Sequence, residues 1–313
     1  MNNYQASCLL CPQHCQLRHE QAGRCRARIN KEGEILSLTY GEMAAWHVDP
    51  IEKKPLYHFY PGSRIFSVAG YGCNLSCTFC QNYEISQSRR SGQKITPEEL
   101  AEMCKDSLGL CITYTEPTMW YEMIRDTAPL VRKNGGKVVL ISNGIIEQRF
   151  LEEILPYIDA MNIDIKGYSD EFYRKYCGAK LAWVLNTVER VAGRIHLEVT
   201  TLIIPGANDD MEEIQGLANW LSELGVPVPW HLSRYYPAYK LNVPPTERET
   251  LERLWDLARE KLPYVYLGNL AGGSTTYCPV CQAEVISRDY QIINRTQNGH
   301  CAKCGEMIFG QGF

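Results

Sequence analysis

Three cysteines in the first third of the chain have a spacing that suits an iron–sulfur cluster. Cys73, Cys77 and Cys80 follow the order C-x3-C-x2-C. Three thiolates are one ligand too few for a closed four-ligand metal site. A [4Fe–4S] cluster bound in this way keeps one iron free for a chelating cofactor. The alternatives are a zinc loop or unrelated buried cysteines. Phe79 before the last cysteine, and the place of the motif directly after a predicted strand, favour the cluster.

Cysteine is unusually frequent, at 14 of 313 residues. The N-terminus has no charged stretch followed by an apolar one, so we expect no secretory signal. In a long chain without such a signal, this many cysteines indicates metal or redox chemistry rather than disulfides. Three cysteines stand apart from the others and are expected to be buried and inert: Cys104, Cys111 and Cys177.

Two pairs of cysteines near the C-terminus have the spacing of a tetrahedral metal site. The pairs are Cys278 with Cys281 and Cys301 with Cys304, separated by 19 residues. This C-x2-C…C-x2-C pattern predicts a zinc ribbon or a rubredoxin-like site, and zinc is favoured over iron. A C-terminal piece of this size cannot build much apolar core, so the metal would supply its folding energy.

A third group of four cysteines lies at the N-terminus with irregular spacing: Cys8, Cys11, Cys15 and Cys25. Four thiolates could hold zinc or an auxiliary iron–sulfur cluster. We favour zinc on the sequence alone. An auxiliary cluster would imply an electron relay or an anchor for substrate, which is a different mechanism.

Strand and helix patterns alternate six times between residues 64 and 261. This alternation predicts a parallel α/β sheet with helical crossovers, either open or curved into a barrel. Functional loops then belong at the carboxyl ends of the strands. A Thr96-Pro97-Glu98-Glu99 segment predicts a helix start. The expected strands are Arg64–Ala69, Leu110–Thr115, Lys137–Ser142, Met161–Ile165, His196–Ile203 and Trp230–Tyr235. The expected helices are Met119–Lys133, Gln148–Ile158, Asp170–Ala192, Met211–Leu224 and Glu247–Lys261.

These patterns divide the chain into three expected domains. Residues 1–60 form a cysteine-rich N-terminal metal-binding lobe, residues 61–270 the α/β core, and residues 271–313 the C-terminal ribbon.

The central motif and its position resemble the radical S-adenosylmethionine (SAM) superfamily over about residues 64–270. The resemblance implies a partial (β/α)6 barrel, similar to an incomplete TIM barrel, and SAM bound to the open iron. It further implies that an electron from the cluster cleaves SAM. The resulting 5′-deoxyadenosyl radical then abstracts a hydrogen atom from the substrate.

The same resemblance assigns cofactor contacts to the ends of consecutive strands. Thr115 and Glu116 stand where the family has a Gly-Gly-Glu-Pro-like turn, and Glu116 would accept from the amino group of SAM. Lys166 would contact the SAM carboxylate, and Asp164 would hold Lys166 or a cation. Each segment also has a structural interpretation, since Asn-Gly is a common turn and Asp with Lys is often a solvated pair. The remaining residues of the expected cofactor site are Phe79, Asn143, Thr200 and Ile204.

Tyr236 marks a departure from the activating enzymes of glycyl-radical proteins, which have histidine at this position. A phenol changes the acid–base chemistry available there. We therefore expect Tyr236 to be a catalytic residue and glycyl-radical activation to be the less favoured function.

The whole pattern, including both flanks, is similar to the radical SAM member of the AmmeMemoRadiSam system. The resemblance is found in six stretches: Cys8–Cys15, Asp49–Phe59, Cys73–Glu84, Tyr114–Pro117, Pro229–Leu241 and Cys278–Gly305. The resemblance implies a Memo-like protein and an AMMECR-domain protein as partners, with a flavodoxin or ferredoxin as electron donor. The substrate would be a peptide, a protein or a small molecule.

Charge and hydropathy argue against two other classes of partner. The net charge is −4 and the sequence pI is about 6.0, so no global basic surface for nucleic acid is present. No apolar run reaches the roughly 18 residues that a membrane helix needs. We expect a cytoplasmic enzyme without nucleic-acid or membrane partners. A metal-stabilised electron-transfer module is the non-catalytic alternative.

Overall fold

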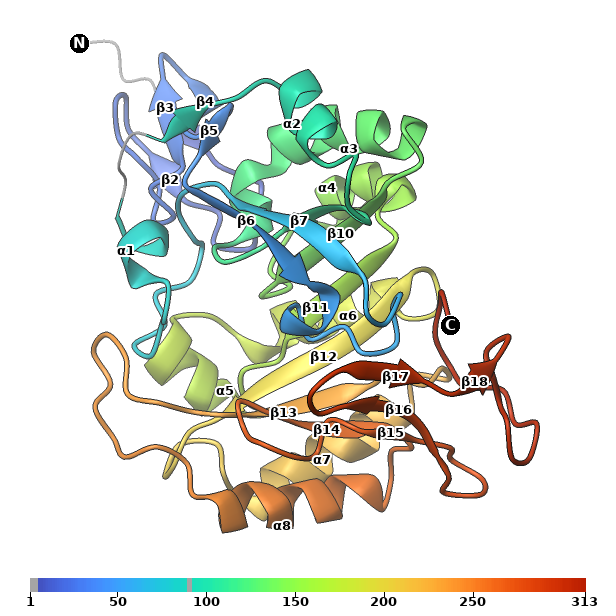
Figure 1. Cartoon of the computed structure of the whole chain (residues 1–313). Helices are drawn as coiled ribbons and strands as arrows, with labels where there is room; N and C mark the ends of the chain where they lie inside the picture. Colours follow the sequence, from blue (N-terminus) through green and yellow to red (C-terminus); the bar gives the residue numbers. More distant parts are fainter. Residues whose placement is uncertain (1–4, 89–91) are drawn as a thin grey trace.

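One large sheet carries the fold in the computed structural model, which describes residues 5–88 and 92–313 (Figure 1). Within those residues the sheet has eight strands in the order β14-β13-β12-β11-β10-β9-β7-β6. All neighbours from β7 to β14 pair in parallel. The parallel strands are β7 (Arg64–Ala69), β9 (Gly109–Ile112), β10 (Lys137–Ser142), β11 (Ala160–Asp164), β12 (His196–Ile203), β13 (Trp230–Arg234) and β14 (Val265–Gly268).

The expected fold class, an α/β partial barrel, is confirmed, and all six expected strands are present. The structure adds two strands to this sheet that the sequence analysis overlooked. One is β14, a four-residue strand too short to give a clear pattern. The other is β6 (Ala45–Pro50), which pairs antiparallel with β7. Because β6 lies in the sheet, the expected boundary at residue 60 does not coincide with the edge of the sheet, and the three-domain division remains a prediction.

Helices that connect the parallel strands cover the outer face of the sheet (Figure 1). Thr96 caps α2 as predicted, because its side chain accepts from Glu99 N and the Glu99 side chain accepts from Thr96 N. The apolar faces of these helices pack onto the sheet and form one continuous core. The helices are α2 (Pro97–Met103), α3 (Tyr121–Lys133), α4 (Gln148–Ile154), α6 (Leu181–Val191), α7 (Met211–Ser222) and α8 (Arg248–Arg259).

The helix expected over residues 170–192 is wrong in one respect, because it is interrupted. A short α5 (Asp170–Phe172) leads into a π-helical turn, η4 (Tyr173–Cys177). Gly178 then adopts a left-handed φ of +70°, which ends the helix before α6 begins. The interrupted segment contacts the cysteine loop, because the carbonyl of Cys177 accepts a hydrogen bond from Ser76 N at 3.0 Å.

The N-terminal part of the chain is built from short strands and turns. It packs against the barrel, where Glu147 N donates to the carbonyl of Leu10 at 3.0 Å. Its elements, with those of the cysteine loop, are β1 (Ala6–Ser7), β2 (Gln16–Leu17), β3 (Arg28–Lys31), β4 (Glu34–Ser37), β5 (Glu42–Met43), η1 (Ile51–Lys53), α1 (Tyr83–Ser86) and β8 (Gln93–Lys94).

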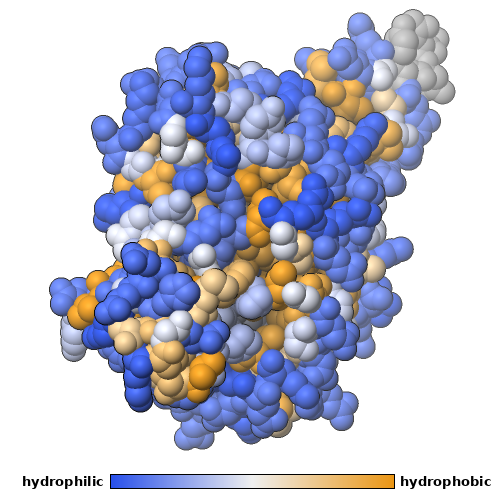
Figure 2. Space-filling view, turned by 90° about the vertical axis from the view of Figure 1, so that its right-hand side faces the viewer, coloured by the Kyte–Doolittle hydropathy of each residue, from blue (hydrophilic) through white to orange (hydrophobic). Residues whose placement is uncertain are grey.

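The C-terminal piece covers the amino ends of the barrel strands, opposite the carboxyl ends where functional loops belong. His58 Nδ1 lies 2.6 Å from the carbonyl of Phe309, and Tyr266 Oη lies 2.9 Å from Thr276 Oγ1. The face of the molecule shown in Figure 2 is mostly hydrophilic, with apolar side chains gathered in patches. Its strands are β15 (Thr276–Tyr277), β16 (Glu284–Arg288), β17 (Ile292–Asn294), β18 (Thr296–Gln297) and β19 (His300–Cys301).

None of the helices in the described parts of the chain combines the length and the apolar character needed to cross a bilayer.

Candidate active site

A cavity of about 470 Å³ opens at the carboxyl ends of the parallel strands. This volume lies within the usual range for small-molecule sites. The strand-end positions that the sequence singled out line it together. The lining residues used below are Lys54, Cys73, Cys77, Phe79, Cys80, Tyr114, Thr115, Glu116, Asn143, Asp164, Lys166, Thr200, Ser233 and Asn269.

The cysteine loop leaves β7 through a glycine that no other residue could replace without strain. Gly72 has a φ of +90°, and a Cβ there would lie 2.4 Å from the carbonyl oxygen of Cys25. Hydrogen bonds then orient two of the cysteine sulfurs. Leu75 N donates to Cys73 Sγ at 3.4 Å, and Cys80 Sγ lies 3.2 Å from Ser86 Oγ on α1.

The three sulfurs of the cysteine loop are not gathered as tightly as the ligands of a single zinc ion. In a mononuclear zinc site the sulfurs are about 3.8 Å apart, the edge of a tetrahedron with a Zn–S bond of about 2.3 Å. Among the residues that the structure describes, Cys73, Cys77 and Cys80 do not form a group whose sulfurs all lie within 4.8 Å of one another. Ligands to different irons of one cluster stand farther apart, so this donor set fits a [4Fe–4S] cluster with one open iron.

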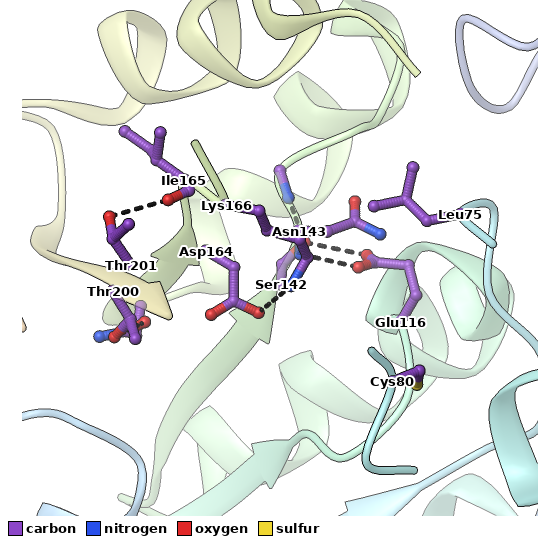
Figure 3. Close-up of polar contacts among 12 residues, drawn as sticks. Leu75, Cys80, Glu116, Ser142, Asn143, Asp164, Ile165, Lys166, Thr200 and Thr201 are labelled. Atoms are coloured by element: carbon purple, nitrogen blue, oxygen red, sulfur yellow. Dashed lines mark hydrogen bonds and ion pairs between the residues drawn. The ribbon is translucent and has the colours of Figure 1, made fainter. Parts of the chain in front are cut away.

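Glu116 organises the ends of two strands beside the cysteine loop. Its Oε1 accepts from Ser142 Oγ at 2.9 Å and from Thr118 N at 2.9 Å, and its Oε2 accepts from Asn143 N at 2.8 Å (Figure 3). Burial raises the pKa of this carboxyl group, and these donors work in the opposite direction. The structure thus gives Glu116 a positioning function, and its contact with the amino group of SAM remains a prediction.

Asn143 connects that carboxylate to the first cysteine. Its Nδ2 donates to Asn74 Oδ1 at 2.8 Å and lies 3.6 Å from Cys73 Sγ, while its Oδ1 accepts from Ile145 N. The side-chain amide is therefore held in one orientation at the cavity wall.

Asp164 and Lys166 form an ion pair at the end of β11, with 3.0 Å between Asp164 Oδ2 and Lys166 Nζ (Figure 3). Burial disfavours the ammonium, but the Asp164 carboxylate and the Cys77 sulfur outweigh it and hold the pKa of Lys166 well above its usual value. Lys166 therefore keeps its positive charge in the cavity. On the adjacent strand, Thr200 Oγ1 donates to Asn162 Oδ1 at 2.9 Å.

A second lysine in the cavity was missed. Lys54 is 2% exposed, and its Nζ lies 2.6 Å from Asp49 Oδ2. Tyr114 Oη donates to the same oxygen at 2.6 Å. Burial disfavours the charged carboxylate of Asp49, but hydrogen bonds from Lys54 and Tyr114 outweigh this effect and hold the pKa of Asp49 far below its usual range. The only signal in the sequence was the conspicuous Asp49–Phe59 stretch.

Only some of the other expected site residues line the cavity. Phe79 and Thr115 line the cavity, as expected, whereas Tyr236 and Ile204 are not among its lining residues in the described part of the chain. Tyr236 is 42% exposed, with its Oη 3.3 Å from an Arg234 nitrogen. Its catalytic assignment remains a prediction.

Ser233 and Asn269 also line the cavity but were overlooked. Asn269 follows β14, a strand that the sequence pattern did not reveal.

The four C-terminal cysteines converge on one point. The Sγ atoms of Cys278 and Cys304 are 3.5 Å apart, and those of Cys281 and Cys301 are 3.6 Å apart. All four sulfurs lie within 4.8 Å of one another. These separations suit a single tetrahedral metal ion. The site lies in the piece that covers the amino ends of the strands, away from the cavity.

Comparisons with known proteins agree with this geometry. A sequence family described as the radical SAM superfamily matches residues 67–221. The uncharacterized protein MJ0808 of Methanocaldococcus jannaschii is 43% identical over 323 residues, which cover 98% of this chain and 96% of that protein. The (2S)-3-sulfopropanediol dehydratase activating enzyme of Klebsiella oxytoca is 28% identical over 119 residues, 37% of this chain and 38% of that enzyme.

The pyruvate formate-lyase-activating enzyme of Clostridium pasteurianum is 26% identical over 164 residues, 49% of this chain and 67% of that enzyme. Among solved structures, SuiB of Streptococcus suis bound to S-adenosylmethionine aligns with a TM-score of 0.53 at 15% identity, over 64% of this chain and 48% of SuiB, which supports the fold. The chain belongs to the radical SAM superfamily. It is an enzyme of a class that uses a [4Fe–4S] cluster and SAM.

Proposed function

We propose that this chain cleaves SAM reductively and uses the resulting radical to abstract a hydrogen atom from a peptide, a protein or a small molecule. The observation that carries the proposal is the cavity itself. It brings three cysteines, Asn143 and the Asp164–Lys166 pair together from separate strand ends.

Each of these residues has a distinct task in the proposal. Cys73, Cys77 and Cys80 hold the cluster, which supplies the electron that breaks the S–C5′ bond of SAM. Lys166, kept charged by Asp164, binds the SAM carboxylate. Asn143 donates toward Cys73 and fixes the wall beside the open iron. Thr200 lines the region assigned to the nucleoside.

The direct test is anaerobic reconstitution with iron and sulfide, followed by reduction with dithionite in the presence of SAM. We expect 5′-deoxyadenosine and methionine in equal amounts, measured by liquid chromatography and mass spectrometry. A cluster that is fully assembled by its absorption spectrum but yields no 5′-deoxyadenosine would contradict the proposal.

Replacement of Lys166 by alanine is expected to weaken SAM binding by roughly 10- to 100-fold, because a hydrogen bond to a charged group contributes about 1.5–3 kcal/mol. The affinity can be measured from the change that SAM makes in the electron paramagnetic resonance (EPR) spectrum of the reduced cluster. Lys175, exposed on η4, provides a matched control. Equal affinities in Lys166→Ala and Lys175→Ala would remove Lys166 from the SAM site.

The relatives named as activating enzymes support a second candidate, in which the substrate is a glycine of a partner enzyme. The departure at Tyr236 and the two additional cysteine groups favour another substrate. Formation of a glycyl radical on a partner protein, detected by EPR, would support this second candidate.

We further propose that the chain is the radical SAM member of the AmmeMemoRadiSam system, with Memo-like and AMMECR-domain proteins as partners and a flavodoxin or ferredoxin as electron donor. The support is the resemblance of stretches along the whole chain, including both cysteine flanks. In this proposal residues 1–60, 61–270 and 271–313 act as three domains. Measurement of SAM turnover with each candidate partner present tests the assignment.

Zinc is the metal that we propose for the C-terminal cysteines. Replacement of Cys278 by serine is expected to lower the zinc content by about one ion per chain, since the closed site loses a ligand. The small core behind it, Val285, Ile286 and Ile308, should then exchange its amide hydrogens faster. Metal analysis by mass spectrometry checks the first result, with Cys104→Ser as control. Iron with a rubredoxin-like spectrum in place of zinc would contradict the assignment.

A further inference from the structure

The four N-terminal cysteines surround a second cavity, away from the SAM site. Cys8, Cys11, Cys15 and Cys25 all line it, together with Arg28, Asn74 and Met119. Three of the four cysteines are buried, and Cys15 is partly buried. The chain turns tightly to bring them there, because Cys8 N donates to the carbonyl of Cys15 at 2.9 Å and His14 N donates to that of Cys11 at 3.1 Å.

These sulfurs have the surroundings of metal ligands rather than of inert thiols. The backbone N–H groups of Leu10, Gln13 and Ala27 lie close to the sulfurs two residues before them, those of Cys8, Cys11 and Cys25. In the cluster loop, Leu75 N donates to Cys73 Sγ from the same relative position. Backbone donors of this kind stabilise thiolates bound to a metal.

The buried thiol of Cys104 has a different environment. Cys104 Sγ donates to the carbonyl of Leu100 at 3.0 Å, as a protonated thiol does.

A donor in the cavity wall also lacks a partner. The Arg28 side chain is 4% exposed and binds the Glu122 carboxylate, with 2.7 Å between Arg28 Nη2 and Glu122 Oε2. Its Nε is buried and makes no hydrogen bond. A buried donor without an acceptor is costly. The sulfur atoms of a bound metal group would supply the acceptor.

The separations of the sulfurs distinguish the two candidate metals. The C-terminal cysteines provide the internal reference for zinc, with all four sulfurs within 4.8 Å of one another. Over residues 5–88 and 92–313, no three of the N-terminal cysteines form such a group, although the four line one cavity. In the described part of the chain, Cys73, Cys77 and Cys80 likewise form no group with all sulfurs within 4.8 Å. Sulfurs are spread in this way when each binds a different iron.

We propose that Cys8, Cys11, Cys15 and Cys25 bind a second [4Fe–4S] cluster rather than the zinc that the sequence favoured. All four irons then have protein ligands, so this cluster has no open iron for SAM or substrate.

The position of the second cluster suits transfer of electrons to the first. Asn74 stands between them, since it lines the cavity of the N-terminal cysteines and its Oδ1 accepts from Asn143 Nδ2, which lies 3.6 Å from Cys73 Sγ. The closest approach of the backbones is at Gly72, which packs against the Cys25 carbonyl. A reduced flavodoxin or ferredoxin would give one electron to the second cluster, which would pass it to the first and return to its oxidised state. This relay, unlike the cluster itself, rests on the proposed SAM cleavage.

The test separates the two clusters by mutation. In the variant Cys73→Ala/Cys77→Ala/Cys80→Ala, reconstituted anaerobically, we expect about four irons per chain and the EPR signal of one reduced [4Fe–4S] cluster. Addition of SAM should leave this signal unchanged, because no iron is open. Wild type should contain about eight irons and about one zinc.

The reciprocal variant, Cys8→Ala/Cys11→Ala, should lose about four irons and keep a signal that SAM alters. If that variant does not fold, the iron content of wild type and of the triple variant decides the question. Two zinc ions and about four irons in wild type would overturn the proposal, as would a triple variant without iron. These results do not depend on SAM cleavage, so they are distinct from a failure of the proposed function.

Discussion

Replacement of Cys73 by alanine is expected to abolish formation of 5′-deoxyadenosine. Cys73 is one of only three protein ligands proposed for the cluster, and two hydrogen bonds, from Leu75 N and the Asn143 amide, are directed at its sulfur. Changes outside the ligand shell of a metal already cost 10- to 100-fold. Loss of a ligand should therefore lower the rate by more than roughly 100-fold. The product is measured after anaerobic reconstitution and reduction.

Cys104 provides the matched control, because it is 2% exposed, lies on the C-terminal side of α2 and is not a cavity residue. Cys104→Ala should retain 5′-deoxyadenosine formation at a level close to wild type. If Cys73→Ala also retains it, the three-cysteine motif is not the site of SAM cleavage. If N-terminal iron remains in Cys73→Ala, the loss of product is assigned to the SAM cluster alone.

Replacement of Glu198 by alanine is expected to lower the free energy of unfolding by about 3–5 kcal/mol, the range for an uncompensated buried ionic network. Glu198 is fully buried, and His196 and His231 donate to its carboxylate from 2.9 Å and 2.7 Å. The backbone N–H groups of Tyr57 and His58 donate to it as well. Truncation leaves all four donors without an acceptor.

Glu198 also ties the barrel to the C-terminal piece, because His58 binds the carbonyl of Phe309. The control is Glu152→Ala, which removes an exposed ion pair with Arg194 and should change the free energy of unfolding little. Denaturant unfolding of the metal-loaded protein measures both. Equal effects of the two substitutions would show that the Glu198 network contributes no more than a surface pair.

The same network makes stability sensitive to acid. Although burial opposes the charge, hydrogen bonds from His196 and His231 hold the pKa of Glu198 well below its usual 4.5, so its contribution is full above that pH and is lost below it. Burial lowers the pKa of His58 from 6.5 to about 3, so the unfolded chain binds this proton first and stability declines as the pH falls below 6.5. Glu198→Gln should therefore make the decline below pH 4.5 less steep, because only the contribution of Glu198 is lost there, and should leave the decline between pH 4.5 and 6.5.

Local sequence patterns predicted the six strands and the residues at their ends, because side-chain periodicity and turn residues report on neighbouring positions. Asn143, Asp164 and Lys166 meet in one cavity because parallel strands bring their carboxyl ends together. Two features escaped this reasoning. The four residues of β14 give too little periodicity, and the expected long helix is interrupted at Gly178, whose left-handed backbone ends η4.

Contacts between distant segments could not be inferred from spacing. Lys54 enters the cavity because β6 joins the sheet beside β7, and its charge is balanced by Asp49 and Tyr114. Glu116 was expected to face SAM, yet its oxygens accept hydrogen bonds from neighbouring strand ends. Tyr236 is 42% exposed and does not line the cavity, but its Oη donates to the carbonyl of Asn269, a lining residue, at 3.5 Å, so its catalytic function remains a prediction.

The sequence by itself determined the class of enzyme and the identity of the cysteines, because ligand number and spacing along the chain limit which metal groups can bind. Only the tertiary structure decided how those cysteines are used. Two sets of four cysteines have the same ligand count, but one converges on a point and the other surrounds a cavity. The difference is a matter of distances between sulfurs, and those distances are fixed by how each loop packs against the barrel.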